Sequence, residues 1–154
     1  MKDDHAAVDA GGVRVAIVAA RFNDFVTDRL VEGAVACLDQ FGGREEDRQI
    51  IRVPGAWEVP LAVDRVAPQV DAVVAIGALI RGETTHYDYI CEEVARGLGA
   101  ASRTHGVPVT FGVLTCETAE QATARAGGEH GNKGFESALA ALEMVQIYRR
   151  LAKG

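Results

Sequence analysis

A dense cluster of polar residues interrupts the stretch AIGALIRGETTHYDYICEEV, residues 75–94. The stretch begins as an uncharged apolar run, turns polar at Arg81, and becomes an amphipathic helix from Tyr87 onward. The unpaired backbone N–H groups in the first turn of such a helix form a ready site for an anion. Thr84 and Thr85 add hydroxyl donors to this turn. The cluster therefore predicts an anion-binding site at the start of the helix.

His86 lies at the mouth of the predicted anion site. An unperturbed imidazole has a pKa of about 6.5, which suits it for acid–base catalysis at neutral pH. A single histidine is more often structural than catalytic. Its place beside the anion site strengthens the case for proton transfer, but both interpretations of His86 stay open at this point.

Other candidate binding residues follow the other predicted strands. Phe22, after the apolar run 13–20, could stack on a planar ring or cap the core. Ala56 is small enough to let a ligand approach the backbone. Glu58 stands at a helix N-terminus, where simple capping also explains a carboxylate. Arg125, near a helix end, could bind phosphate or pair with helix carbonyls.

The elements that must position these residues alternate between strand and helix. The strand-forming runs are continuously apolar, which is typical of a parallel sheet covered on both faces. We therefore predict a flavodoxin-like α/β fold, a three-layer α/β/α sandwich with a four-stranded parallel sheet, in which ligands bind beyond the carboxyl ends of the strands. The predicted strands are 13–20, 48–53, 72–80 and 107–115, and the predicted helices are 25–41, 57–69, 86–103, 118–126 and 135–151.

Length and composition favour one globular domain over residues 1–154, with 48% hydrophobic residues. The net charge of −6 argues against nucleic acid as a main partner. Cys37, Cys91 and Cys116 have no C-x-x-C spacing, so we expect reduced thiols and a cytoplasmic protein. The polar N-terminus does not resemble a signal peptide, and no apolar run approaches the roughly 20 residues that span a membrane.

Common cofactor and metal motifs do not match. GGEHGNKG, residues 127–134, contains a lysine but lacks the phosphate-loop spacing, and it follows a helix. No G-x-G-x-x-G follows the first strand, and there is no G-x-S-x-G. His86 and Cys91 lack the two further ligands that a zinc site needs. We therefore expect neither a cofactor nor a metal.

Nearly the whole chain resembles the 6,7-dimethyl-8-ribityllumazine synthase family of riboflavin biosynthesis. The matching segments are in the family's order and at its spacings: VRVAIVAARFN, VPGAWEVP, AIGALIRGETTHYDYIC, GVPVTFGVLT, EQATARAG and GNKG. The resemblance implies that 5-amino-6-(D-ribitylamino)uracil condenses with 3,4-dihydroxy-2-butanone 4-phosphate. An imine forms, phosphate leaves, and the second nitrogen closes the ring, without any cofactor.

The resemblance also implies a role for each matching residue. Phe22 would stack on the pyrimidine, and His86 would transfer protons. Glu83 and Thr84 would meet the phosphate at the helix N-terminus. The remaining positions would hold the ring and ribityl chain or line the pyrimidine slot: Ala56, Trp57, Glu58, Ala78, Leu79 and Ile80.

In the family, a neighbouring subunit completes the site. Phe111, Arg125 and Lys133 match those positions, and Arg125 would bind phosphate. The resemblance thus implies a homopentamer, whose N-terminal arm, residues 1–12, extends along a neighbour although we expect it to be disordered when alone. The short connection 127–133 is typical of members that form an icosahedral shell of sixty subunits.

Three alternatives to this reaction stay open on the sequence. The first is a riboflavin synthase of the archaeal type, which would dismutate two lumazines and leave Arg125 unused. The second is a flavin- or lumazine-binding module without turnover, which the pairing of His86 with a phosphate site disfavours. The third is a shell-forming protein whose chemistry is secondary.

Overall fold

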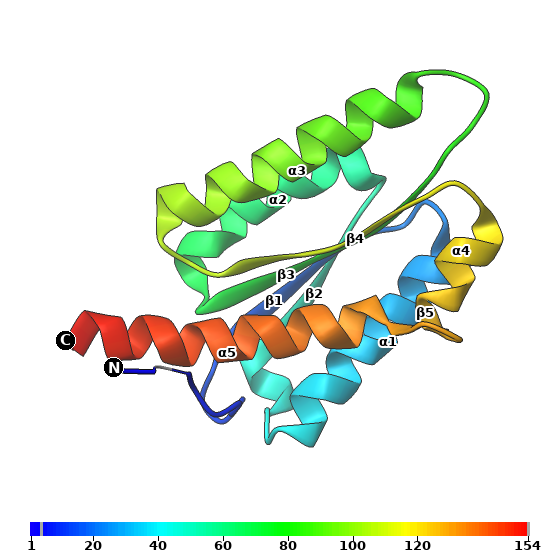
Figure 1. Cartoon of the computed structure of the whole chain (residues 1–154). Coiled ribbons are helices and arrows are strands. Elements are labelled where there is room, and N and C mark those ends of the chain that lie inside the picture. Colours follow the sequence, from blue (N-terminus) through cyan, green and yellow to red (C-terminus); the bar gives the residue numbers. More distant parts are fainter. Residues whose placement is uncertain (4, 154) are drawn as a thin grey trace.

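The computed structural model describes residues 1–3 and 5–153, and a four-stranded parallel sheet lies at its centre (Figure 1). The strand order is β2-β1-β3-β4, and every neighbouring pair is parallel. The predicted α/β fold with a four-stranded parallel sheet is confirmed. The strands are β1 (Val15–Ala20), β2 (Arg48–Val53), β3 (Ala72–Ile80) and β4 (Val109–Cys116).

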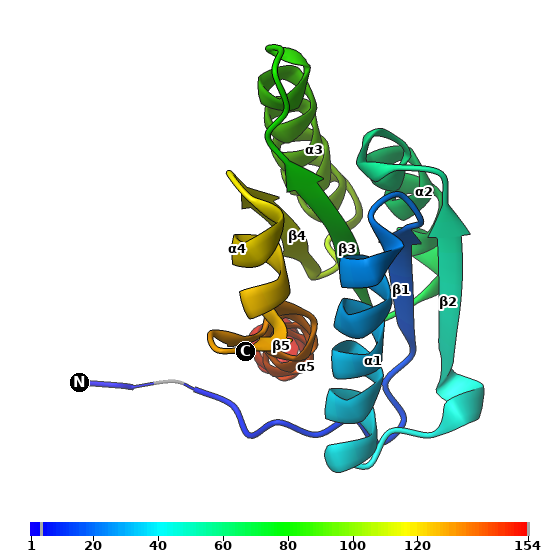
Figure 2. The same cartoon turned by 90° about the vertical axis from the view of Figure 1, so that its right-hand side faces the viewer.

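Helices cover both faces of this sheet (Figure 2). One face packs against α1 (Asp24–Gln40) and α5 (Lys133–Lys153), and the other against α2 (Val59–Val66) and α3 (His86–His105). The short α4 (Ala119–Ala124) follows β4. None of the helices in the described part of the chain has an apolar stretch long enough to cross a membrane. The short elements are the 3₁₀ turns η1 (Glu45–Asp47), η2 (Ala56–Glu58) and η3 (Ala67–Gln69) and the antiparallel strands β5 (Ala126–Gly128) and β6 (Gly131–Asn132).

Two hydrophobic clusters, one on each face, explain why β1 and β3 are apolar throughout. Ile17 and Ile76 point toward α1 and α5, whereas Val18 and Val73 point toward α2 and α3. Successive side chains of a strand point to opposite faces, so both sets are buried. The edge strands β2 and β4 differ, because Ile50 is 44% exposed and Phe111 is 41% exposed. The expectation of a strand buried on both faces is wrong for these two strands.

The GNKG segment, residues 131–134, allows α1 and the start of α5 to pack closely together. A β-carbon at Gly134 would collide with the carbonyl oxygen of Leu30, so only glycine permits this close approach. The Asn132 side chain accepts a hydrogen bond from the Phe135 N–H at 3.0 Å and donates one to the Arg29 carbonyl at 3.0 Å. It therefore caps the start of α5 and ties it to α1.

Several element boundaries differ from the prediction. The helix expected over 57–69 is divided into η2, α2 and η3. The last helix begins at Lys133, two residues before the predicted start, because Asn132 supplies its cap. The segment 127–134, expected to be an irregular break, contains most of the β5–β6 hairpin and the first residues of α5.

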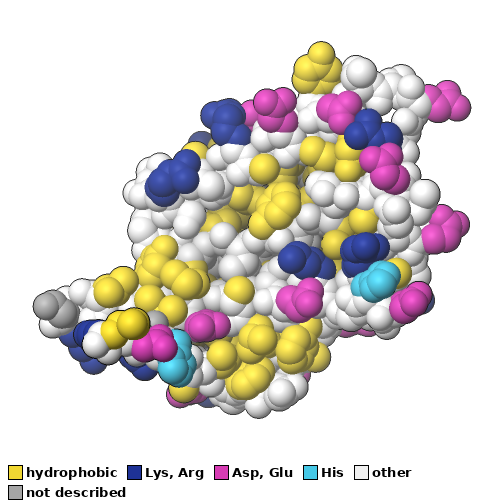
Figure 3. Space-filling model, in the orientation of Figure 1, with side chains coloured by type: hydrophobic (Ala, Val, Ile, Leu, Met, Phe, Trp, Pro, Cys, Tyr) yellow, Lys and Arg dark blue, Asp and Glu magenta, His cyan; other side chains and the backbone are white. Residues whose placement is uncertain are grey.

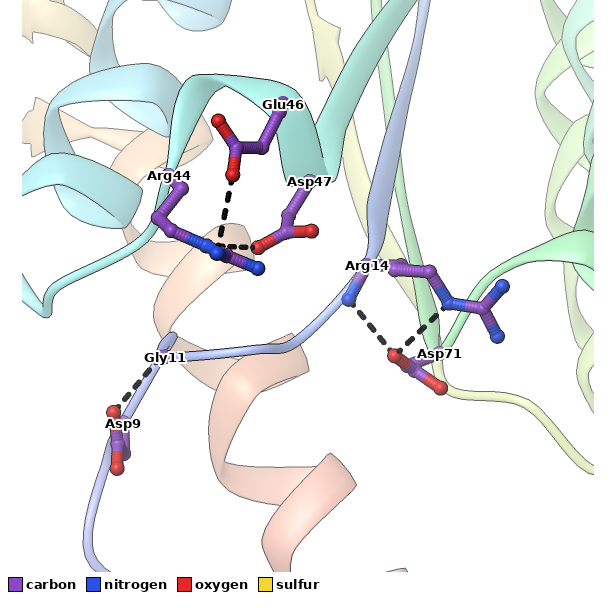
Figure 4. A network of polar contacts seen from close by, with 7 residues as sticks. All are labelled: Asp9, Gly11, Arg14, Arg44, Glu46, Asp47 and Asp71. Carbon is purple, nitrogen blue, oxygen red and sulfur yellow. Dashed lines mark hydrogen bonds and ion pairs between the residues drawn. The ribbon is translucent and has the colours of Figure 1, made fainter.

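The N-terminal segment lies along its own chain. Ala10 is 1% exposed, and its N–H donates to the Phe41 carbonyl at 2.9 Å. Figure 4 shows Asp71, the residue before β3, accepting a hydrogen bond from the Arg14 N–H at 2.8 Å and facing the Arg14 guanidinium. The expected disorder of the arm does not hold at its carboxyl end, where these contacts fix the chain. Figure 2 shows the first residues leading away from the sheet.

Candidate active site

A cleft of ≈ 720 Å³ opens where β1 and β3 end, and we call it the carboxyl-end cleft. Its walls come from the loop after β1, from η2, from the end of β3 and from the first turns of α3. This is the position at which a parallel α/β sheet binds its ligands. It contains these residues from the sequence prediction: Phe22, Ala56, Trp57, Glu58, Ala78, Leu79, Ile80, Thr84 and His86.

Glu83 does not line this cleft, although its two neighbours Gly82 and Thr84 do. Its side chain is exposed to solvent. A carboxylate would also repel a bound phosphate, so any contribution of Glu83 to an anion site must come from its backbone N–H.

The walls of the carboxyl-end cleft are largely aromatic and aliphatic. Phe22 is 71% exposed and Trp57 is 55% exposed, whereas Ala78 and Leu79 are buried. Exposed aromatic rings above a buried aliphatic floor form a slot that suits a flat, weakly polar ring system. No lysine or arginine is among the described residues that line this cleft.

Asn23 is a lining residue that the sequence analysis missed. It adopts a left-handed conformation with φ 66°, which asparagine tolerates better than most residues. Its Nδ2 donates a hydrogen bond to the Ala78 carbonyl at 2.8 Å, and its own carbonyl accepts from the N–H groups of Val26 and Thr27. Asn23 thus starts α1 and fixes the loop after β1 to the end of β3. The signal in the sequence was an asparagine three residues after the end of β1.

The first turn of α3 presents the predicted catalytic histidine. Residues 81–86 are exposed, and His86 is the first residue of the helix. The His86 N–H donates to Thr84 Oγ1 over a long 3.4 Å. Tyr87, Tyr89 and Ile90 also line the cleft, and Tyr87 and Ile90 pack at the same time against the hydrophobic cluster beneath α3.

The three cysteines are free thiols, but they are poor nucleophiles. Burial raises the pKa of Cys37 to about 11, and burial also raises the pKa values of Cys91 and Cys116. Burial is likewise the main cause that raises the pKa of the Tyr87 hydroxyl. Cys37 and Cys116 are buried and Cys91 is partly buried, and a thiol whose pKa is raised stays protonated at neutral pH, so none of the three suits covalent catalysis.

A second cleft of ≈ 480 Å³ lies beside β4, between that strand, α4 and the start of α5, and we call it the β4 cleft. It contains the other predicted residues, Phe111, Arg125 and Lys133. The Arg125 Nη1 donates to the Gln121 carbonyl at 3.0 Å. The sequence analysis did not select the other lining residues, among them Gln121, His130 and Glu136.

The two clefts share no lining residue. A single chain therefore brings His86 together with Phe22 but keeps both apart from Arg125 and Lys133. Figure 3 shows the face that carries β4 and α5, where hydrophobic patches lie beside Lys, Arg and His side chains. Within the part of the chain that the structure describes, no three His, Cys, Asp or Glu side chains are grouped to hold a metal ion.

Comparisons with known proteins identify the family. The sequence profile of 6,7-dimethyl-8-ribityllumazine synthase matches residues 12–149. The chain belongs to this family. The 6,7-dimethyl-8-ribityllumazine synthase of Aquifex aeolicus is 54% identical over 144 residues, which cover 92% of this chain and 94% of the relative. Membership makes the chain an enzyme, a transferase of riboflavin biosynthesis.

Two further relatives of the same name have similar coverage. The protein of Halorhodospira halophila is 54% identical over 140 residues, which cover 90% of each chain. The protein of Chlorobium phaeovibrioides is 50% identical over 144 residues, which cover 92% of this chain and 93% of the relative. The matched length therefore includes the residues of both clefts.

Proposed function

We propose that the protein condenses 5-amino-6-(D-ribitylamino)uracil with 3,4-dihydroxy-2-butanone 4-phosphate to give 6,7-dimethyl-8-ribityllumazine, with loss of phosphate and water. The supporting observation is the carboxyl-end cleft, which combines an aromatic slot with the N-terminal turn of α3 and His86. A slot for a flat ring and a site for an anion stand side by side, as this pair of substrates requires.

The pyrimidine occupies the aromatic slot in this proposal. Phe22 stacks on the ring, and the buried Ala78 and Leu79 with Ile80 form the floor. The backbone of η2, which includes Ala56 and Trp57, and the Glu58 carboxylate hold the ring and the ribityl chain. Backbone groups suit this role because Ala56 is small and η2 leaves them near the cleft.

The phosphate ester lies at the start of α3, where backbone N–H groups near Glu83 and the hydroxyl of Thr84 face an anion. His86 is the proton-transfer residue of the carbinolamine, imine and ring-closing steps. Each of these steps moves a proton without any change of oxidation state. Side-chain acid–base catalysis is therefore sufficient, and we propose that no cofactor takes part.

A neighbouring subunit supplies Phe111, Arg125 and Lys133, with Arg125 on the phosphate. Support comes from the separation of the two clefts within one chain. A head-to-tail interface that closes into a ring joins one cleft to the other at every contact. We propose a pentamer of single-domain chains, residues 1–154, with the arm 1–12 on a neighbour. Twelve pentamers then form a shell of sixty subunits in the cytoplasm.

The deciding experiment mixes the two proposed substrates with the protein and follows lumazine absorbance and phosphate release together. Both signals must rise in equal amounts. Lumazine consumption without any phosphate ester would instead indicate the riboflavin synthase reaction, and binding without turnover would indicate a carrier. Analytical ultracentrifugation tests the assembly: a single species at the pentamer mass removes the shell, and an active monomer removes the shared site.

A further inference from the structure

Arg81 stands at the end of β3 but does not line either cleft. Its guanidinium has three contacts with other elements. Nη2 and Nη1 bond the two carboxylate oxygens of Asp88 at 3.0 and 3.3 Å, Nε lies 2.9 Å from a carboxylate oxygen of Glu117, and the guanidinium carbon lies 4.5 Å from the centre of the Tyr87 ring. Its backbone N–H donates to the Cys116 carbonyl at 2.9 Å.

These contacts join segments that carry the two clefts. Tyr87 and Asp88 belong to the first turn of α3, while Glu117 connects β4 to α4. The Glu117 N–H donates to Gln121 Oε1 at 2.8 Å, and the Gln121 carbonyl accepts from Arg125 at 3.0 Å. A continuous set of polar contacts therefore leads from the loop before His86 to Arg125.

The loop between Arg81 and His86 has little other support. Within residues 1–3 and 5–153, no backbone hydrogen bond is donated by any residue from Gly82 to Thr85. These N–H groups lie directly before the first turn of α3, so they can add to the unpaired N–H groups of that turn when an anion binds there. The loop keeps them free for a ligand, so its shape must be set from its two ends.

We propose that Arg81 is a positioning residue, which holds the loop 82–86 in its binding geometry and fixes it relative to the β4–α4 connection. This inference rests on the proposed role of His86 and of the first turn of α3 in turnover. Arg81 itself touches no substrate. The planar guanidinium can bond two carboxylates and stack on a ring at the same time, whereas a lysine ammonium cannot reproduce that fork.

Stability is not the main effect of these contacts. The Arg81, Asp88 and Glu117 side chains are 38%, 54% and 60% exposed, and exposed ion pairs contribute little to folding. Misplacing a catalytic group by about 1 Å, in contrast, costs on the order of a hundred-fold in rate. A stabilising role of Arg81 therefore predicts a lower unfolding temperature when the residue is replaced, whereas a positioning role predicts a lower kcat.

The test compares Arg81→Gln and Arg81→Lys with the wild type. We expect kcat to fall about ten- to a hundred-fold in Arg81→Gln, and nearly as much in Arg81→Lys, because a displaced His86 transfers protons poorly. The affinity for inorganic phosphate should fall, the KM for the pyrimidine should stay within about two-fold, and the unfolding temperature should not change. Arg96→Gln is the matched control, because Arg96 makes a similar exposed ion pair with Glu93 on α3, at 2.6 Å, outside both clefts.

Hydrogen exchange of the backbone amides gives a readout that does not depend on turnover. In Arg81→Gln the hydrogen-bonded amides at the two ends of the loop should exchange faster, namely that of residue 81, which donates to the Cys116 carbonyl, and those of Asp88 and Tyr89, which donate to the Thr85 carbonyl, while those of the α3 interior stay protected. Glu117→Gln should give a smaller change of the same kind, which keeps the proposal testable if Arg81→Gln fails to fold. Exchange rates and kcat equal to wild type in these variants would overturn the inference. A wild type that forms no lumazine would instead contradict the proposed function, and the exchange result would still decide whether Arg81 holds the loop 82–86 in place.

Discussion

The carboxyl-end cleft has aromatic and aliphatic walls, whereas the β4 cleft contains Arg125, Lys133 and His130. The first suits a flat heterocycle, and the second offers the cations that a phosphate dianion requires. Within one chain, neither cleft combines a slot for a flat ring with the cations for a phosphate. This difference is the reason for the proposal that a complete site takes His86 from one copy of the chain and Arg125 from another.

Replacing His86 should produce the largest loss. A general acid–base residue contributes about a hundred- to ten-thousand-fold, and we expect His86→Ala to lie near a hundred-fold in kcat because both substrates are inherently reactive. Folding should be intact, since the side chain is exposed. Steady-state kinetics measure the effect, with His5→Ala as a control at another exposed histidine. Full activity and an unchanged pH profile would remove His86 from the mechanism.

Arg125→Ala tests the cationic side of the comparison. A hydrogen bond to a charged group contributes about 1.5–3 kcal/mol, so the KM of the phosphate-bearing substrate should rise about ten- to a hundred-fold. Pyrimidine binding should be nearly unchanged. Calorimetric titration with each substrate measures the affinity for the phosphate ester and the affinity for the pyrimidine separately. The control is Arg103→Ala, at an exposed position near the end of α3. A loss of pyrimidine affinity alone would reverse the assignment of the two clefts.

Phe22→Ala tests the aromatic side and should give the opposite pattern. An aromatic stacking pair contributes about 0.5–1.5 kcal/mol in addition to the hydrophobic effect of its buried area. The pyrimidine affinity should therefore fall at least about three- to ten-fold. Phosphate affinity should be unaffected. Phe22→Tyr keeps the ring and should retain binding in the same titration. If the alanine variant bound the pyrimidine as tightly as wild type, Phe22 would be a capping residue only.

Mixing two impaired variants tests whether the clefts meet between chains. His86→Ala and Arg125→Ala subunits, co-expressed in equal amounts, should form rings in which about one quarter of the sites have both intact halves. Activity should therefore recover to about one quarter of the wild-type value, above that of either variant alone. The control is the same two proteins mixed after separate assembly. An absence of recovery in mixed rings would place both halves in one subunit.

The sequence was most informative where one chain segment decides the outcome. Continuous apolar runs located β1 and β3 to within two residues, because strands covered on both faces need apolar side chains at every position. The sequence did not predict the exposure of β2, because the position of this strand at the edge of the sheet follows from the strand order of the folded protein. The start of α5 was missed because its cap, Asn132, is held by the Arg29 carbonyl of α1.

The candidate site residues divide in the same way, into those that one chain segment identifies and those that depend on the folded structure. The residue types and the strand-end rule selected Phe22, Thr84 and His86, all of which line one cleft. They did not select Asn23, whose left-handed conformation and bond to β3 appear only in the folded chain. The role assigned to Arg81 depends on contacts with Glu117, 36 residues away.

By itself the sequence determined the α/β class, the end of the sheet where the carboxyl-end cleft lies and the residue types available there. These depend on periodicity and residue chemistry, which are local properties of the chain. Only the tertiary structure decided that Arg125 and Lys133 lie in a different cleft from His86. The reason is the order of the strands: β4 takes the edge next to β3, and this places the residues that follow β4 beside that edge and away from the loop after β1.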